Sequence, residues 1–221
     1  EPTSKGVKPL VKAVHPGIGP ISGGTVALIR VVPADLKAKV FFGGKLASVL
    51  GADGADALVV ETPAHLAGPV NVSVMLPDGK AHTLLNAFTY YKPAPGVKPP
   101  LLTQVKASSG ADAGGEKITY SGQEFAPGSL AFLGFRPLTG VALQSSASLT
   151  GITPAHPQGL VAAAVTRPDG MSTILKATYS YKVPAPEPKA VFPSVGQTAG
   201  GTTVAISGKF FAPGAKVFFG K

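Results

Sequence analysis

One eight-residue sequence occurs twice in this chain, as Ser121-Gly-Gln-Glu-Phe-Ala-Pro-Gly128 and as Ser207-Gly-Lys-Phe-Phe-Ala-Pro-Gly214, with six of the eight positions identical. Each copy follows a Gly-Gly pair and a short run rich in β-forming residues. A pattern this long, with glycine and proline at fixed places, indicates that a whole structural unit was duplicated.

Other motifs fix the period of the duplication. Gly23-Gly24 returns 91 residues later as Gly114-Gly115, and Thr62-Pro-Ala-His65 returns at the same spacing as Thr153-Pro-Ala-His156. A third pair, Gly200-Gly201, follows the second after 86 residues, and the missing five residues fall in a linker. The chain therefore contains two full repeats and the beginning of a third.

The proline-dense segments between these motifs mark the expected boundaries. We expect a linker at residues 1–8, repeat one at 9–92, a Pro-rich linker at 93–99, repeat two at 100–182, a second Pro-rich linker at 183–188, and the incomplete start of repeat three at 189–221. Pro-rich linkers favour an extended, semi-rigid conformation, so both internal linkers are predicted to be short extended spacers.

Each repeat shows the alternation of half-buried strands. Val70-Asn-Val-Ser-Val74 alternates strictly, which predicts a strand with one buried face and one face toward solvent. Pro77-Asp-Gly79 is a turn sequence, and it predicts a hairpin between Val70–Leu76 and the run that ends at Tyr90. The predicted fold class is all-β: tandem immunoglobulin-like β-sandwiches, two of them complete and a third truncated.

Composition narrows the functions that the chain can have. Among the 221 residues there is no Cys, so disulfides and thiol chemistry are excluded, and no apolar run reaches the roughly 20 residues of a membrane-spanning helix. The net charge of +9 leaves two interpretations open: a polyanionic partner, or solubility alone. The Lys residues are scattered and no Arg-rich stretch occurs, which disfavours binding to nucleic acid.

The candidate chemical sites are weak. His65 and His156 occupy equivalent turns and are expected to pack or hydrogen-bond there, and Asp53 and Asp56 lack the further ligands of a calcium loop. No motif of a serine hydrolase, a phosphate-binding loop or a zinc protease occurs. We expect no catalytic residue, no cofactor and no metal.

One aromatic position recurs outside the predicted core. One aromatic residue occupies the same place in each of the three repeats and points opposite to the core positions Phe42, Leu133 and Phe219: Phe41, Phe132 and Phe218. We predict that they form an interaction surface between domains or chains. The alternative is that an adjacent strand or loop covers them.

The motifs together resemble a known family. The sequences Pro16-Gly-Ile-Gly-Pro-Ile-Ser-Gly-Gly-Thr25, Val40-Phe-Phe-Gly-Gly44, Gly68-Pro-Val-Asn-Val72 and Phe88-Thr-Tyr90 are similar to those of the IPT/TIG domain family. Its members are immunoglobulin-like domains of plexins, of some transcription factors and, in tandem, of bacterial surface proteins. The resemblance covers nearly the whole chain and implies the fold more directly than it implies a function.

The expected function is a non-enzymatic, extracellular module at the cell surface, a semi-rigid array that serves spacing, adhesion or filament assembly. Its partners would be proteins, further copies of itself, or an anionic cell-surface polymer or polysaccharide. The Ala-, Gly- and Pro-rich composition suggests a bacterial source. Two alternatives remain: a carbohydrate-binding accessory region of a secreted glycosidase, and a nucleic-acid-binding region of the transcription-factor type.

Repeats one and three depart from the pattern. Repeat one has Arg30-Val-Val-Pro-Ala-Asp-Leu-Lys37 in place of the Ser-Gly-x-x-Phe-x-Pro-Gly loop, so this loop is expected to take another conformation. In repeat three, Val204, Ile206 and the run Val217–Phe219 are expected to face solvent. Either the sequence is a cut fragment, or strands of another chain complete this repeat.

Overall fold

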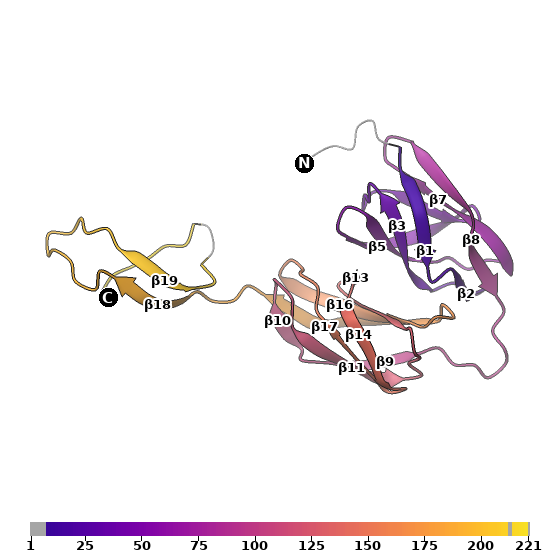
Figure 1. Cartoon of the computed structure of the whole chain (residues 1–221). Coiled ribbons are helices and arrows are strands. Elements are labelled where there is room, and N and C mark those ends of the chain that lie inside the picture. The colour runs from indigo at the N-terminus through magenta and orange to yellow at the C-terminus, as the bar shows by residue number, and fades with distance from the viewer. Residues whose placement is uncertain (1–7, 212–213, 221) are drawn as a thin grey trace. The chain divides into compact units, whose positions relative to one another are not determined.

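The computed structural model of this protein describes residues 8–211 and 214–220. These residues form strands and turns and contain no helix, which confirms the all-β prediction. The chain divides into two compact units, residues 1–181 and residues 182–221. The first unit holds repeats one and two, and the second holds the start of repeat three (Figure 1).

Repeat one is a β-sandwich whose two layers are joined by one long strand. Its strands are β1 (Leu10–His15), β2 (Ile18–Pro20), β3 (Val26–Val32), β4 (Lys39–Phe42), β5 (Lys45–Asp53), β6 (Ala57–Glu61), β7 (Gly68–Met75) and β8 (Ala81–Tyr91). They form one sheet in the order β1-β3-β6-β5-β4-β7-β8-β2. The first part of β5 pairs with β4 and the remainder pairs with β6, so β5 crosses from one layer to the other.

Repeat two has the same layers, but they are separate sheets. Its strands are β9 (Leu101–Lys106), β10 (Ser109–Ala111), β11 (Lys117–Gln123), β12 (Leu130–Leu133), β13 (Arg136–Pro137), β14 (Thr139–Ser145), β15 (Ser148–Ile152), β16 (Gly159–Thr166) and β17 (Ser172–Lys182). One sheet has the order β14-β15-β11-β9 and the other β10-β17-β16-β12-β13. The counterpart of β5 is broken here into β13 and β14, so no strand joins the layers.

Each sandwich has its own apolar core, made by the inward positions of its strands. Val72 and Tyr90 lie in the core of repeat one, and Ile118 and Tyr120 lie in that of repeat two. The predicted hairpin is present, because β7 pairs with β8 through the turn at Pro77–Gly79. These observations confirm the predicted immunoglobulin-like sandwiches.

The half-buried strands expected from the sequence are not found at β3 and β6, which are buried on both faces. On β3, Ala27 and Ile29 enter the core of repeat one, while Val26 and Leu28 on the opposite face are also buried. The run Ala57–Val60 of β6 is fully buried on both faces as well. A second sandwich covers the outer face of these strands, so the alternation between apolar and polar residues is lost there.

The first strand pairing of each repeat is the same in register. Its outermost partners are Leu10↔Val32, Leu101↔Gln123 and Glu187↔Lys209, which follow one another at the sequence spacings of the repeats. All three pairings also contain an irregularity close to that end. The register is therefore a property of the repeat and does not depend on what surrounds it.

The loop motif of repeats two and three has a local packing cause. Gly122 lies where a Cβ atom would overlap the carbonyl oxygen of Leu101 and come within 2.6 Å of the ring of Phe125. Only glycine leaves room for this buried ring. Repeat one has Val31 and Ala34 at these places, so it lacks both the glycine and the large ring.

The linker between repeats one and two is not fully extended, contrary to the prediction. The Val97 N–H donates to the Ala94 carbonyl at 3.3 Å, and the turn passes through Gly96 with φ of 83°. Glycine reaches this left-handed conformation without strain, so the chain reverses direction inside a Pro-rich segment.

The second unit contains a single pair of described strands, β18 (Glu187–Phe192) and β19 (Ala205–Lys209). Val217, Phe218 and Phe219 are largely exposed, as the sequence predicted, with Phe218 at 82%. Val204 and Ile206 are half-buried instead, because their strand packs beside β18.

Candidate functional site

The most extensive contact outside the two cores joins the outer face of β3 and β6 to the outer face of β12 and β16. Six buried side chains form what we call the inter-repeat cluster: Val26, Leu28, Ala57, Val59, Phe132 and Ala164. Leu50, Leu130, Phe135 and Ile174 pack against it in a partly buried state. Repeats one and two are thus held together by an apolar layer between sheets, in addition to the linker.

Polar groups at one side of the cluster are paired across the two repeats. The Thr166 hydroxyl donates to the Val26 carbonyl at 2.8 Å, and the Val26 N–H donates to the Ser172 hydroxyl at 2.9 Å. The Thr25 hydroxyl donates to the Gly170 carbonyl at 2.7 Å. The Thr25 and Thr166 bonds are buried, and a buried bond of this kind strongly disfavours separation because its partners would lose their pairing.

Gly170 lies tightly against repeat one. It has φ of 81°, and a Cβ atom on it would overlap the Ile18 carbonyl oxygen and lie 2.6 Å from the Gly19 Cα. The β16–β17 turn therefore fits against β2 only with glycine at its tip.

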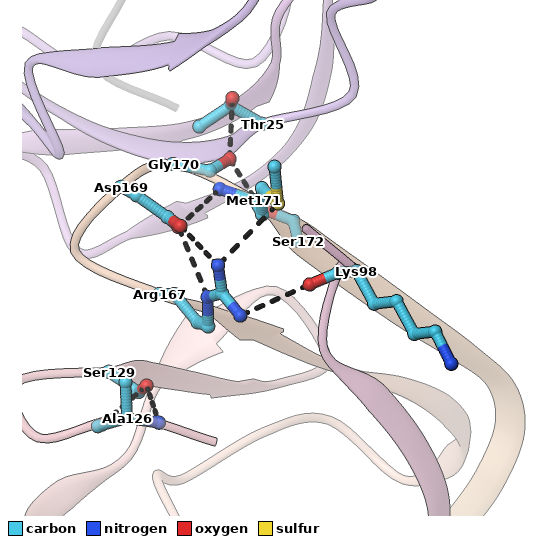
Figure 2. A network of polar contacts seen from close by, with 9 residues as sticks. All are labelled: Thr25, Lys98, Ala126, Ser129, Arg167, Asp169, Gly170, Met171 and Ser172. Carbon is cyan, nitrogen blue, oxygen red and sulfur yellow. Dashed lines mark hydrogen bonds and ion pairs between the residues drawn. The ribbon is translucent and has the colours of Figure 1, made fainter. Parts of the chain in front are cut away.

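The same turn also contacts the linker through Arg167 (Figure 2). The Arg167 guanidinium forms an ion pair with Asp169, and its Nη1 donates to the Lys98 carbonyl at 3.1 Å. It lies 3.6 Å from the sulfur of Met171. Asp169 also accepts the Met171 N–H at 3.1 Å, so one carboxylate fixes both the arginine and the turn.

The protonation states of this network are set by burial and pairing. The bond to Asp169 raises the pKa of Arg167, which stays charged. Burial alone would raise the pKa of Asp169, but the bonds from Arg167 and from the Met171 N–H bring it below its usual value. Both groups are therefore ionised at neutral pH, and the pair carries no free proton for acid–base chemistry.

A second polar contact in Figure 2 belongs to the duplicated loop motif. The Ser129 hydroxyl donates to the Ala126 carbonyl at 2.7 Å, and the Ala126 N–H lies 3.2 Å from the same hydroxyl. This closes the Ala126-Pro-Gly128 turn before β12, which carries Phe132 into the inter-repeat cluster.

The three aromatic residues predicted as an interaction surface have different surroundings. Phe132 is fully buried within the inter-repeat cluster. Phe41 is half-buried on β4, and Phe218 is 82% exposed in the second unit. Phe132 thus contacts a neighbouring repeat, while a binding role for Phe41 and Phe218 stays a prediction.

His65 and His156 have equivalent surroundings. Each ring stacks on the tyrosine of the last strand, Tyr90 or Tyr181, with ring centroids 5.1 Å apart in both cases. Each histidine Nδ1 also lies at hydrogen-bonding distance from a backbone carbonyl of its own loop. The expectation that these histidines pack and hydrogen-bond in a turn is confirmed.

The tyrosine hydroxyls of these pairs bond to the backbone of the same two loops. Tyr90 donates to the Pro63 carbonyl and Tyr181 donates to the Pro154 carbonyl, each at 2.8 Å. Burial raises the pKa of each tyrosine to about 12, so both stay neutral donors in the physiological range.

The acidic residues considered for calcium lie apart from any cluster. Asp56 pairs with Arg30 at 3.3 Å in an exposed position. In the part of the chain that the structure describes, no three His, Cys, Asp or Glu side chains gather in a way that could hold a metal ion. Among the same residues, none lies in a helix with the length and apolarity needed to span a bilayer.

Sequence reasoning missed Thr25, Thr166, Arg167 and Ser172, which carry the polar part of the contact. A signal was present in the run Val26–Ile29, whose four consecutive apolar residues do not alternate. The corresponding run of repeat two, Lys117-Ile-Thr-Tyr120, does alternate. Comparison of the two would have indicated a strand covered on both faces in repeat one.

These features define a pair of immunoglobulin-like sandwiches with a buried contact between them. The family model of the IPT/TIG domain matches residues 9–90, which make up repeat one. The resemblance inferred from the motifs is thereby confirmed for repeat one. No curated protein sequence matches the chain.

Solved structures of similar fold include a plexin A4 extracellular region, with 19% identity over 93% of this chain and 18% of that one, at a TM-score of 0.37. The Ig1-2 module of the Drosophila receptor protein tyrosine phosphatase DLAR matches with 13% identity over 80% of this chain and 100% of its own, at a TM-score of 0.42. SGBP-B from a xyloglucan utilization locus of Bacteroides uniformis matches with 17% identity over 78% of this chain and 48% of its own, at a TM-score of 0.33. The chain spans less than a fifth of the plexin A4 region and about half of SGBP-B.

Proposed function

We propose that this protein is a non-catalytic structural and adhesive module at the cell surface, built from IPT/TIG-type domains with the boundaries expected from the sequence. The observation that carries the proposal is the buried contact between repeats one and two. A module that must hold a binding surface at a set distance gains from such a contact, because it limits motion between domains.

The distribution of polar groups supports a role without catalysis. The tyrosines whose pKa is raised by burial donate hydrogen bonds to backbone carbonyls or to a carboxylate within their own repeat. Arg167 and Asp169 neutralise one another, and no buried side-chain nitrogen or oxygen in the described residues lacks a hydrogen-bond partner. Active sites instead tend to keep polar groups available in a cleft.

Binding to intact cells tests this proposal. Fluorescently labelled protein is expected to bind the surface of source or host cells saturably, and Phe41→Ala or Phe218→Ala is expected to weaken that binding. Lys106→Ala, on the exposed edge strand β9, is the surface control. Binding at both low and high salt would indicate a protein partner, whereas loss at high salt would indicate an anionic polymer.

The same assay separates the alternatives. Selective binding to a purified polysaccharide would support the glycan-binding alternative if the protein binds neither untreated cells nor cells treated with protease. Binding to duplex DNA with a steep salt dependence would support the nucleic-acid alternative. Hydrolysis of any polymer by the purified chain, or the absence of all surface binding and of polymers in electron micrographs, would overturn the proposal.

A further inference from the structure

The residues that join repeats one and two are not repeated in the chain. The outer faces of β3 and β6 contribute four apolar side chains to the inter-repeat cluster. The equivalent positions of repeat two, 91 residues later, are polar: Lys117, Thr119, Ser148 and Thr150. A face of this composition gains little from being covered by another sheet, since its polar groups would lose water.

The complementary face is equally specific. In repeat two it presents Leu130, Phe132, Ala164 and Ile174, of which Phe132 and Ala164 are completely buried. The same positions of repeat one are Lys39, Phe41, Ser73 and Thr83. Ser73 and Thr83 hydrogen-bond to each other across that face at 2.8 Å, with Ser73 half-buried and Thr83 exposed to solvent. Only Phe41 keeps the apolar character of its counterpart.

The polar part of the contact follows the same rule. Thr25, which donates to the Gly170 carbonyl, is replaced in repeat two by Glu116. Glu116 accepts hydrogen bonds from the Tyr179 hydroxyl and from the Ala111 N–H inside its own repeat, both at 3.0 Å. The side chain at this position thus bonds to the neighbouring repeat in repeat one, whereas in repeat two it bonds within its own repeat.

From these differences we propose that repeats one and two form a single cooperative body, joined by faces that the other repeat of the pair does not reproduce. Repeat one supplies the covering face and repeat two the receiving face, so the contact has a direction. The linker at residues 93–99 is then a clamped connection, held by Arg167, and not a hinge. This inference deepens the proposed surface role, because it makes a two-domain body the unit that holds the binding surface.

A pair of matched glycine variants tests the contact. Gly170 and Gly79 occupy equivalent turn tips with φ of 81° and 83°, so alanine strains the backbone equally at both. A Cβ atom on Gly170 would overlap Ile18, whereas one on Gly79 would meet nothing within 4 Å. Gly170→Ala is therefore expected to disturb the contact between repeats, and Gly79→Ala is expected to leave it intact.

Two measurements on the full chain show whether the contact between repeats one and two is kept in each variant. Because the chain has no Cys, spin labels can be placed uniquely at Lys12→Cys and Gln144→Cys, both exposed. A single narrow distance distribution is expected in the otherwise unchanged chain and with Gly79→Ala, and a broadened one with Gly170→Ala. Hydrogen exchange in increasing urea should show the two cores losing protection together, and separately in the Gly170→Ala variant.

Thr25→Val keeps the test decisive if Gly170→Ala fails to fold, because it removes only the bond to the Gly170 carbonyl and preserves the shape of the side chain. It is expected to broaden the distance distribution in the same direction. The direction of the contact is tested by Leu28→Lys, which should separate the two repeats, and by Thr119→Lys at the equivalent position of repeat two. Thr119→Lys should leave both the distance distribution and the loss of protection in urea unchanged.

A broad distance distribution in the unchanged chain, or equal effects of Gly170→Ala and Gly79→Ala, would overturn the inference. Equal effects of Thr119→Lys and Leu28→Lys on the loss of protection would show that the contact does not have this direction. None of these outcomes depends on binding to cells, so the inference and the proposed function can fail separately.

Discussion

The ring of His156 stacks on Tyr181 with 5.1 Å between centroids and an angle of 20° between the ring planes. The Tyr181 hydroxyl donates to the Pro154 carbonyl two residues before that histidine. His65 and Tyr90 reproduce this arrangement in repeat one, at 5.1 Å and 19°. The last strand of each sandwich is thus attached to the loop between β6 and β7, or between β15 and β16, by the same three groups.

Removal of one tyrosine hydroxyl measures how much its hydrogen bond contributes to the free energy of unfolding. Tyr181→Phe leaves the Pro154 carbonyl without its donor, and we expect a loss of about 1 kcal/mol in the free energy of unfolding. Tyr90→Phe is the matched variant and should cost a similar amount, since its bond has the same length. Urea denaturation followed by circular dichroism provides the measurement, and a stability change in only one of the two variants would contradict the equivalence.

The two tyrosines also predict a loss of stability at alkaline pH. Burial raises the pKa of Tyr90 from 10.0 to about 12, so the folded protein favours the neutral phenol. The contribution of the neutral tyrosine to the free energy of unfolding is fully present below its pKa in the unfolded chain. It is lost as the pH rises through its pKa in the folded protein. Thermal melting between pH 9 and about 12 should therefore show a declining Tm, with a shallower decline in Tyr90→Phe and Tyr181→Phe.

Asp169 predicts a corresponding loss in acid. Burial would raise the pKa of Asp169, but the hydrogen bonds from Arg167 and from the Met171 N–H outweigh it and lower the pKa. The stabilisation from the ionised carboxylate is therefore present above its pKa in the unfolded chain, and it is lost as the pH falls through its pKa in the folded protein. Asp169→Asn should flatten the decline in Tm below about pH 4. Asp78→Asn is the matched control in repeat one: the backbone hydrogen bond from Lys80 leads the lowering of its pKa, and its ion pair with Lys80 lies within its own turn. A larger effect of the control would contradict the assignment.

The buried and half-buried members of the recurring aromatic position should differ in stability. Phe132→Ala removes a completely buried ring from the inter-repeat cluster and is expected to cost about 3–5 kcal/mol. Phe41→Ala removes a half-buried ring and should cost clearly less. Guanidinium denaturation of the full chain measures both, and equal losses would show that Phe41 also has a neighbouring domain over it.

The glycine of the duplicated loop is predicted to be irreplaceable in repeat two. Gly122→Ala would force the new methyl group into the Leu101 carbonyl and the Phe125 ring, and overpacking of this kind costs about 1–3 kcal/mol. Gly208→Ala makes the equivalent change in the second unit, against Glu187 and Phe211. It should leave the unfolding of residues 1–181 unaltered, as followed by hydrogen exchange of their core strands.

Much of the fold could be predicted because the repeats report on one another. Core positions such as Val72, Ile118 and Tyr120 follow from alternation that is kept at a spacing of 91 residues. The contact between repeats could not be predicted in the same way, since it depends on where the repeats differ. Val26 and Phe132 are far apart in sequence, and periodicity shows that each has an outward face without showing that the two faces meet.

The polar part of the contact was harder still to predict. Thr25 and Ser172 are ordinary strand-end residues, and their roles come from a neighbour about 145 residues away. The linker shows the same limit, because its proline content predicts an extended chain, whereas Gly96 and the bond from Arg167 to Lys98 set its actual course.

The shared register of β1–β3, β9–β11 and β18–β19 has a consequence for how this protein folds. The partners of the three pairings follow one another at the sequence spacings of the repeats, so the two strands of the ribbon themselves set the register. A ribbon aligned by its own residues gives the later strands of its repeat a fixed template during folding. This reduces the chance that strands of neighbouring repeats, which are so similar in sequence, exchange partners.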